Sequence, residues 1–292
     1  MRKSILSFSA CALLVACASP SDEATQAQRS PATSDDGSSA DANAPAQPET
    51  DDGFDAGSDS DEQDASAAEP VVPGDVQVAI TSDNAFSFGY GDEGGIYTFV
   101  PGVASGAGMI FDCPVGYGPQ TFVVPGADAP EDAYLYIVAW ADRDYTQGTL
   151  AQFKRDHGGT IYSGDEAWQV CATGKEYDPN STPGPDQATV NEYLKACNAG
   201  AAGATFSKGW VDVSGAATSG AIGKLAQGEA NDDASGEFPI VCQVDDAGVP
   251  GIDAAARWMW FDPADGRSAF TNNDGNRTHA FLIFRLPALI LF

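Results

Sequence analysis

The sequence predicts an all-β sandwich with one inserted helix, preceded by a signal peptide and a long acidic linker. Short apolar segments that alternate with polar residues recur between residues 76 and 286, and turn residues separate nearly all of them. One segment, at about 185–197, has the apolar spacing of a helix. Residues 18–72 contain almost no large apolar side chain, so they predict no core.

Residues 1–16 have the pattern of a secretory signal peptide. Arg2 and Lys3 precede an apolar run at 5–15 that is too short to span a bilayer. Leu-Val-Ala then directly precedes Cys17, which resembles the lipobox of bacterial lipoproteins, whose cysteine becomes the acylated first residue. The resemblance implies a lipid anchor at Cys17. Because Ala18 follows rather than Asp, it also implies the outer membrane or cell surface of a Gram-negative bacterium. A plain signal peptide cut elsewhere is the alternative.

Residues 17–72 comprise this cysteine and a predicted disordered stalk. Between 18 and 72 there are 14 acidic side chains against Arg29 alone, and Phe54 is the only aromatic residue. Such a chain cannot bury enough apolar surface to fold, and its like charges repel one another. We therefore expect an extended, solvated linker of roughly 40 Å or more.

Residues 73–292 hold all five tryptophans and most of the large apolar side chains, so we expect a single domain there. This part contains 28 acidic and 11 basic residues, a net charge of −17. That charge excludes nucleic acid as a partner, because a phosphate backbone would be repelled.

The strands begin with two alternating runs, Val76–Ile80 and Phe86–Tyr90, separated by a polar turn at 82–84. This pattern predicts a β-hairpin. Further short strands are expected at 96–100, 109–111, 121–124, 133–140, 168–171, 210–213, 239–244, 258–261 and 280–286.

The predicted helix begins at Pro185, which suits a first helical position, and Gly200 lies just past its end. Val190, Tyr193, Leu194 and Cys197 fall on one face of this helix. We expect it to be an insertion on the sandwich.

Four cysteines follow Cys17, at positions 113, 171, 197 and 242. An even number in an exported chain predicts two disulfides. Three connectivities are possible. We favour Cys171 with Cys197 and Cys113 with Cys242, because the first pair closes a short segment around one insertion.

Five segments stand out among the strands: 80–88 (ITSDNAFSF), 134–142 (YLYIVAWAD), 147–153 (QGTLAQF), 164–170 (GDEAWQV), and 256–260 (ARWMW) with 281–285 (FLIFR). Together they resemble the galactose-binding-like jelly rolls that serve as accessory modules in bacterial glycoside hydrolases, notably the rhamnosidase type. The last pair normally leads the module and here closes it, which a circular permutation would explain. The resemblance implies a jelly-roll sandwich with an accessory, non-catalytic role.

Motifs for nucleophilic catalysis are absent from the sequence, which has neither a GxSxG elbow nor an SxxK pair. His157 and His279 are the only imidazoles, and both are expected at surface turns or strand edges. We therefore expect no enzyme, with a relative of the glycoside hydrolases as the third-ranked alternative.

A calcium site is one possible cofactor site. Asp262, Asp265 and Asp274 lie with several Asn residues in one segment beside a strand pair, and all offer hard oxygen ligands. A polar turn built from Asn, Asp and Gly is the competing interpretation.

Aromatic residues supply candidates for a sugar-binding surface, because exposed rings can stack on the apolar faces of pyranoses. Tyr90 and Tyr117 lie among glycines in predicted turns, and Trp210 is a further candidate. Trp258 and Trp260 share one face of a strand and are expected in the core. We expect the Asp83-Asn84 turn to border the same ligand surface.

The expected function is recognition of a glycan or of extracellular matrix by a lipid-anchored domain. The alternative is a structural lipoprotein that docks an envelope protein. Neither class requires nucleic acid or a catalytic centre.

Overall fold

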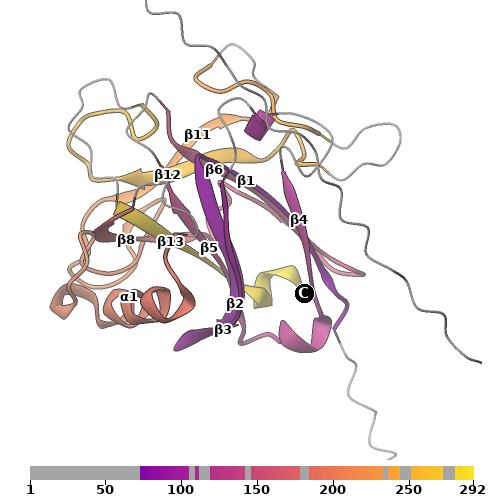
Figure 1. Cartoon of the computed structure of the whole chain (residues 1–292), viewed down its shortest axis with the longest axis horizontal. Helices are drawn as coiled ribbons and strands as arrows, with labels where there is room; N and C mark the ends of the chain where they lie inside the picture. Colours follow the sequence, from indigo (N-terminus) through magenta and orange to yellow (C-terminus); the bar gives the residue numbers. More distant parts are fainter. Residues whose placement is uncertain are drawn as a thin grey trace, which may run out of the picture. The chain divides into compact units, whose positions relative to one another are not determined.

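The computed structural model of the chain describes residues 73–104, 109–111, 119–141, 146–177, 184–232, 236–243, 251–271 and 280–292. These residues form a sandwich of two antiparallel sheets with one α-helix, which confirms the predicted fold class (Figure 1). The predicted signal peptide, Cys17 and the stalk lie outside the described residues.

Sheet A has six strands, in the order β11–β12–β6–β1–β4 with β7 beside β6. Their bounds are Lys224–Ala230, Arg257–Asp262, Gly148–Arg155, Val76–Asp83, Gln120–Val124 and Thr160–Tyr162. Sheet B has seven strands, in the order β10–β9–β8–β13–β5–β2–β3. Their bounds are Gly215–Ala216, Val211–Asp212, Gln169–Glu176, Ala280–Pro287, Tyr134–Trp140, Ala85–Asp92 and Gly95–Ala104.

The main core contains aromatic side chains from both sheets. Phe88 of sheet B stacks on Phe122 of sheet A with ring centroids 4.9 Å apart, and Phe153 contacts Trp168 edge-on at 5.3 Å. Trp258 and Trp260 are buried, which confirms their predicted place in the core. Burial of each such side chain contributes about 2–3 kcal/mol, so this layer dominates the stability of the sandwich.

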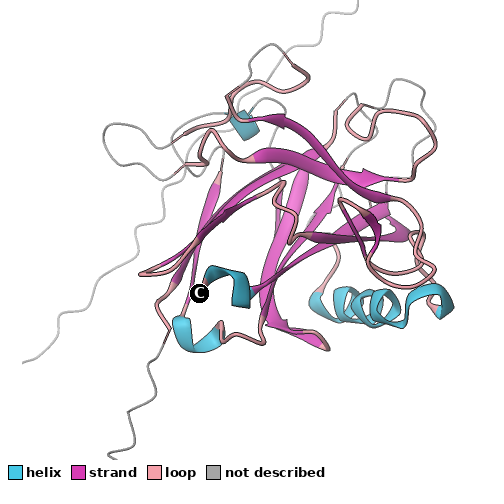
Figure 2. Ribbon diagram, turned by 180° about the vertical axis from the view of Figure 1, so that it is seen from behind, coloured by secondary structure: helices cyan, strands magenta, loops and turns pink. Residues whose placement is uncertain are grey.

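A second apolar cluster lies under helix α1, Gln187–Ala199. Val190 and Leu194 of the helix pack on sheet B there, and a disulfide joins Cys197 of the helix to Cys171 of β8. Figure 2 shows the helix beside the strands rather than between them. The favoured pairing of Cys171 with Cys197 is therefore confirmed. Cys242 is also disulfide-bonded, but Cys113 lies outside the described residues, so their pairing stays a prediction.

The helix begins two residues later than the position predicted from Pro185. Asp186 is the N-cap, and its carboxylate accepts a hydrogen bond of 2.8 Å from the backbone N–H of Thr189. This cap defines the start, because a side-chain acceptor satisfies a donor that the first turn leaves unpaired. Gly200 ends the helix with φ +67°, as its position predicted.

Amide side chains of α1 cover the backbone of β3, the strand at one end of sheet B. The Asn191 amide accepts from the N–H of Ile96 at 2.8 Å and donates to the carbonyl of the same residue at 3.1 Å. Gln187 donates to that carbonyl at 2.8 Å. The inserted helix therefore occupies a sheet edge that would otherwise be open to pairing with another chain.

The predicted hairpin between the first two strands is wrong. β1 pairs with β4 and β6 in sheet A, whereas β2 pairs with β3 and β5 in sheet B. The polar turn therefore carries the chain from one sheet to the other. Both strands are buried almost throughout, and a hairpin with one solvated face would not bury them in this way.

Other assignments also differ from the sequence prediction, and the short strands β7 and β10 were not expected. Met109–Phe111 is a 3-10 helix rather than a strand, and Lys224–Ala230 is a strand that the alternation did not reveal. The expected strand at 239–244 is not formed over 239–243. There the Asn231 side chain accepts from the N–H of Val241 at 2.7 Å and donates to the carbonyl of Ile252 at 2.8 Å, so one side chain replaces a strand partner.

Arg155, at the end of β6, is a buried cation that joins several segments. Its guanidinium donates to the carbonyl of Gly74 at 3.0 Å and to the carbonyl of Ala129 at 2.7 Å. It also lies 4.0 Å from the centre of the Phe292 ring. The start of β1, the turn at 126–129 and the last residues of the chain therefore meet at one side chain.

Replacing Arg155 by Met should destabilise the domain by about 2–4 kcal/mol, because the buried carbonyl of Ala129 and the partly buried carbonyl of Gly74 lose their donor. Urea unfolding followed by tryptophan fluorescence measures this change. Arg257→Met is the matched control, since Arg257 is exposed and donates to a single carbonyl, that of Gly228. A similar loss in both variants would contradict the role given to Arg155.

Candidate functional site

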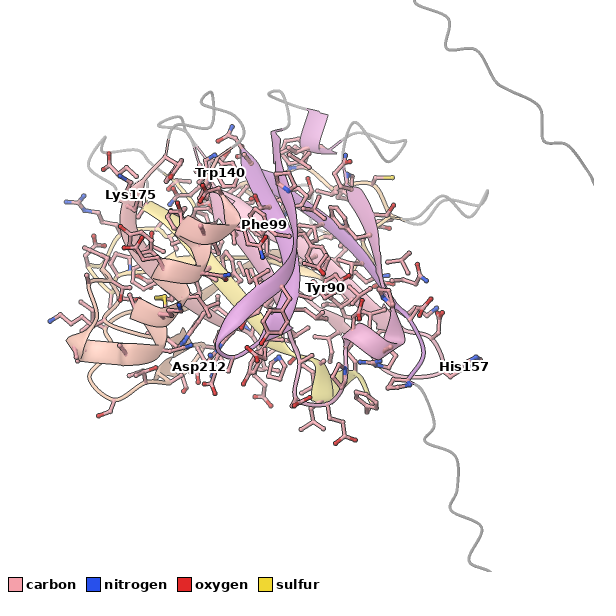
Figure 3. The ribbon with its side chains drawn as sticks, turned by 60° about the horizontal axis from the view of Figure 1, so that its bottom comes forward. Tyr90, Phe99, Trp140, His157, Lys175 and Asp212 are labelled. Carbon is pink, nitrogen blue, oxygen red and sulfur yellow. A yellow bond between two sulfur atoms is a disulfide. The ribbon has the colours of Figure 1, made fainter. Side chains whose placement is uncertain are left out.

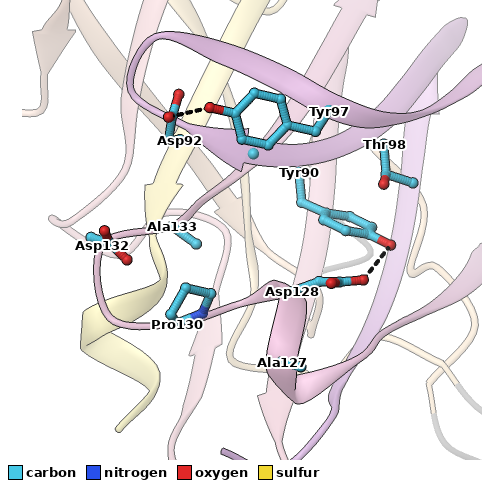
Figure 4. A pocket seen from close by; sticks show the side chains of 10 residues that line it. Tyr90, Asp92, Tyr97, Thr98, Ala127, Asp128, Pro130, Asp132 and Ala133 are labelled. Atoms are coloured by element: carbon cyan, nitrogen blue, oxygen red, sulfur yellow. Dashed lines mark hydrogen bonds between the residues drawn. The ribbon is translucent and has the colours of Figure 1, made fainter.

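A cleft of about 330 Å³ lies between the β2–β3 hairpin and the segment that leads into β5 (Figure 4). Its lining combines two phenol rings, three carboxylates and small or apolar residues. The lining residues are Tyr90, Gly91, Asp92, Tyr97, Thr98, Ala127, Asp128, Pro130, Asp132 and Ala133.

Asp92 organises the hairpin side of the cleft. One oxygen of its carboxylate accepts from the backbone N–H of Gly94 at 2.7 Å and of Gly95 at 3.0 Å. The other oxygen accepts from the Tyr97 hydroxyl, as Figure 4 shows. Asp92 thus closes the turn and holds a ring whose residue is 68% exposed. Tyr97 is presented to solvent in one orientation, which lowers the entropy that a ligand contact would cost.

This hydrogen bond changes the acidity of both partners. The phenol donor lowers the pKa of the Asp92 carboxyl, and the N–H groups of Gly94 and Gly95 act in the same direction. The carboxylate in turn raises the pKa of the Tyr97 phenol, because ionisation would remove the donor. Asp92 is therefore ionised and Tyr97 neutral at neutral pH.

The hairpin turn is also fixed from behind. The backbone carbonyl of Glu93 accepts from Asn198 of α1 at 2.6 Å, and its carboxylate lies 3.7 Å from the guanidinium of Arg285. Arg285 lies 4.0 Å from the centre of the Trp210 ring. The helix insertion therefore supports one wall of the cleft without lining it.

The opposite wall is the 3-10 turn Gly126–Asp128. The Asp75 carboxylate accepts from the N–H of Gly126 at 2.9 Å, and Arg155 holds the carbonyl of Ala129. A Cβ at position 126 would overlap the carbonyl of Pro73, so only glycine allows this close approach. The Tyr90 hydroxyl lies 3.5 Å from the Asp128 carboxylate across the cleft.

The arrangement supplies groups that can bind a polar ligand. An exposed ring offers an apolar face, and the carboxylates can accept hydrogen bonds from hydroxyl or ammonium groups. No Ser, Cys, His or Lys is among the described residues that line the cleft, but its three carboxylates belong to a class of side chain that can act as a base or nucleophile. Asp92 has a lowered pKa, the opposite of what a general acid at neutral pH requires.

The described imidazole does not belong to this cleft. His157 lies in an exposed turn with φ +60°. Figure 3 shows it at the periphery, well away from Tyr90. This agrees with the surface position expected for it, while His279 lies outside the described residues.

Of the predicted ligand residues, Tyr90 lines the cleft. Asp83 and Asn84 do not; Asp83 is only 8% exposed and accepts from the Thr146 hydroxyl at 2.5 Å. Thr146 also pairs with Thr271, so Asp83 lies near Thr271. Its burial argues against direct contact with a large ligand.

Trp210 is buried, at 1% exposed, so the candidate sugar-stacking role is not available to it in this structure. Its indole N–H donates to the Asn198 side chain at 2.7 Å and its ring packs against Arg285. Tyr117 lies outside the described residues. The sequence predicted an accessible Trp210 because the neighbouring two-residue strand, β9, is too short to indicate which of its faces is buried.

The candidate calcium ligands are engaged in turns. The Asp262 carboxylate accepts from the N–H of Ala264 and lies 3.8 Å from Lys224, and Asp265 accepts from the N–H of Arg267. Among the described residues no group of three or more His, Cys, Asp or Glu side chains could hold a metal ion. Asp274 is not among those residues, so the calcium site stays a prediction.

Tyr97, Asp92, Asp128 and Asp132 were not singled out from the sequence. The run Gly91-Asp92-Glu93-Gly94-Gly95 did carry a signal, since an Asp before glycines commonly closes a turn through its side chain. The position of Asp128 and Asp132 opposite that turn depends on how β4 and β5 are joined.

No family model, curated protein or solved structure matches this chain. No helix within the described ranges is long and apolar enough to cross a membrane.

Asp92→Asn should lower the pKa of Tyr97 towards the ordinary value of about 10, because the charge that opposes phenol ionisation is removed. Ring-carbon NMR of labelled tyrosine over an alkaline titration measures this. Asp128→Asn is the control and should leave the Tyr97 titration unchanged. Identical curves for Asp92→Asn and the unaltered chain would refute the coupling.

Proposed function

We propose that this chain is a lipid-anchored protein of a Gram-negative cell envelope whose β-sandwich recognises a glycan in the Tyr90–Tyr97 cleft. The domain is non-catalytic in this proposal. The anchor is the acylated Cys17, and the acidic segment 18–72 is the tether that holds the domain away from the membrane.

The observation that carries the glycan-binding proposal is the composition of the cleft. A ring held by its own hydroxyl can cover one apolar face of a pyranose, while carboxylates around it accept from hydroxyl groups. The 330 Å³ volume is at the lower end of the range for small-ligand sites, which suits one or two sugar units.

The fold also supports a glycan-binding module, although less directly than the cleft. Galactose-binding-like accessory modules are antiparallel sandwiches, and this chain forms such a sandwich. A permuted order requires that the two ends of the domain lie side by side. Gly74 and Phe292 both contact Arg155, which satisfies that requirement.

A protein partner is the second candidate. The same exposed tyrosine beside carboxylates would suit a basic side chain at the centre of a small interface. The domain charge of −17 would speed association with a basic partner.

Tyr97→Ala should weaken glycan binding about tenfold, because the loss of one buried ring face removes about 1–2 kcal/mol. A glycan array on the Cys17→Ser form identifies the ligand, and titration calorimetry then measures the affinity. The thermal midpoint should change little, as for other exposed positions. Ile222→Ala, 44% exposed and outside the cleft, is the control. Absence of any bound glycan would leave protein docking as the better account.

Cys17→Ser should release the chain from membranes, because the acyl chains are attached only at that residue in this proposal. Detergent-phase partitioning of membrane fractions tests the anchor separately from binding. If the serine variant still enters the detergent phase, another segment holds the protein at the membrane.

A further inference from the structure

We infer that the Tyr90–Tyr97 cleft selects sugars that carry a free, protonated amino group. This inference rests on the proposed glycan-binding function and names the ligand class. The ligand would be an oligosaccharide of unacetylated amino sugars, rather than a neutral or anionic glycan.

The negative charge of the cleft favours a cationic ligand. Asp92, Asp128 and Asp132 supply three carboxylates, and none of the ten lining residues is Lys, Arg or His. The carboxylate of Asp132 is exposed and has no hydrogen-bond partner within the described part of the chain. The cleft therefore offers acceptors and negative charge without a matching cation, which an ammonium group supplies.

Each tyrosine ring of the cleft lies beside a carboxylate. Tyr97 donates its hydroxyl to Asp92, so the ring and the carboxylate are held together at one wall. The Tyr90 hydroxyl lies 3.5 Å from the Asp128 carboxylate of the opposite wall. Figure 4 shows each phenol directed at its carboxylate. An ammonium group between these walls meets carboxylate oxygens and ring faces at once, and both attract cations.

Other glycan classes lack the positive charge that the acidic cleft favours. Uronic acids, sialic acids and phosphorylated sugars would bring negative charge into a cleft that is already acidic, on a domain with a net charge of −17. An N-acetyl group is neutral, so an acetylated sugar would keep the stacking contact and lose the ion pairing. Acetylation should therefore reduce affinity without abolishing it.

The titratable groups around the cleft allow a clean test by pH. They are Asp92, Glu93 and Tyr97 of the hairpin, Tyr90 of β2, Asp128, Glu131 and Asp132 of the opposite segment, and Tyr134, Tyr136 and Arg285 of sheet B. The pKa of the Asp92 carboxyl is lowered and that of the Tyr97 phenol is raised, so this hydrogen-bonded pair keeps its charge between about pH 5.5 and pH 9. The acetylated oligomer meets the same groups, so a change of affinity that it does not share reports the amine of the sugar.

The experiment compares a short β-linked glucosamine oligomer with its fully N-acetylated form by calorimetry, using the Cys17→Ser chain. At about pH 5.5 the free amine should bind about tenfold more tightly, as expected for an exposed ion pair plus a cation–π contact. The advantage should shrink at about pH 9, where the amine is neutral, and at high salt. The acetylated form should show neither dependence.

Two variants separate the cleft from the general charge of the domain. Asp132→Asn, and independently Asp128→Asn, should reduce the preference for the free amine several-fold, because each weakens binding of the free amine more than binding of the acetylated oligomer. Glu192→Gln removes one exposed charge from α1, outside the cleft, and should leave the preference intact. Equal effects of all three variants would assign the preference to overall charge and overturn the inference.

The outcomes also distinguish the inference from the function beneath it. If both oligomers bind equally at every pH, glycan binding stands and amine selection fails. If neither oligomer nor any arrayed glycan binds, the proposed function fails with it. If a lysine-rich peptide binds more tightly than the glucosamine oligomer and competes at the same residues, the cleft is a protein-docking site and the inference is wrong.

Discussion

The buried guanidinium of Arg155 joins segments on which both the sandwich and its candidate site depend. A cation inside a sandwich must have acceptors, and here the carbonyls of Gly74 and Ala129 supply them from two segments far apart in the chain. Arg155 thereby holds the start of β1, the turn at 126–129 and the end of β6 in one arrangement. The same turn carries Asp128 into the cleft, so the constraint that stabilises the domain also sets one wall of its candidate site.

The other wall depends on the helix insertion, although no helix residue lines the cleft. The disulfide between Cys171 and Cys197 attaches α1 to β8, and Asn191 and Gln187 satisfy the edge of β3. Asn198 then contacts the turn that bears Asp92. The insertion therefore has a structural role: it closes a sheet edge and makes the hairpin rigid. The proposed binding residues lie at the ends of β2 and β3 and in the segment before β5.

Hydrogen bonds within the hairpin hold the side chains of the cleft in fixed positions. Tyr97 and Asp92 would be two ordinary surface residues on a mobile turn, whereas the hydrogen bonds of the hairpin make them one preorganised group. Preorganisation matters for a small, open site, because little ligand surface is buried and the ordering cost must be low. The negative charge of the domain then favours cations and disfavours the commonest anionic glycans.

Local pattern was enough to predict the sandwich, the helix and the burial of Trp258 and Trp260, because alternation and helical spacing report which face of an element is apolar. The Cys171–Cys197 bond was also predictable from the short segment it closes. The sequence could not show that β1 and β2 belong to different sheets, because the apolar pattern of a strand does not specify which other strand it pairs with. Nor could it show that Trp210 is covered or that Asp128 faces Tyr90. Those facts depend on contacts between residues tens of positions apart, which only the packing of the two sheets decides.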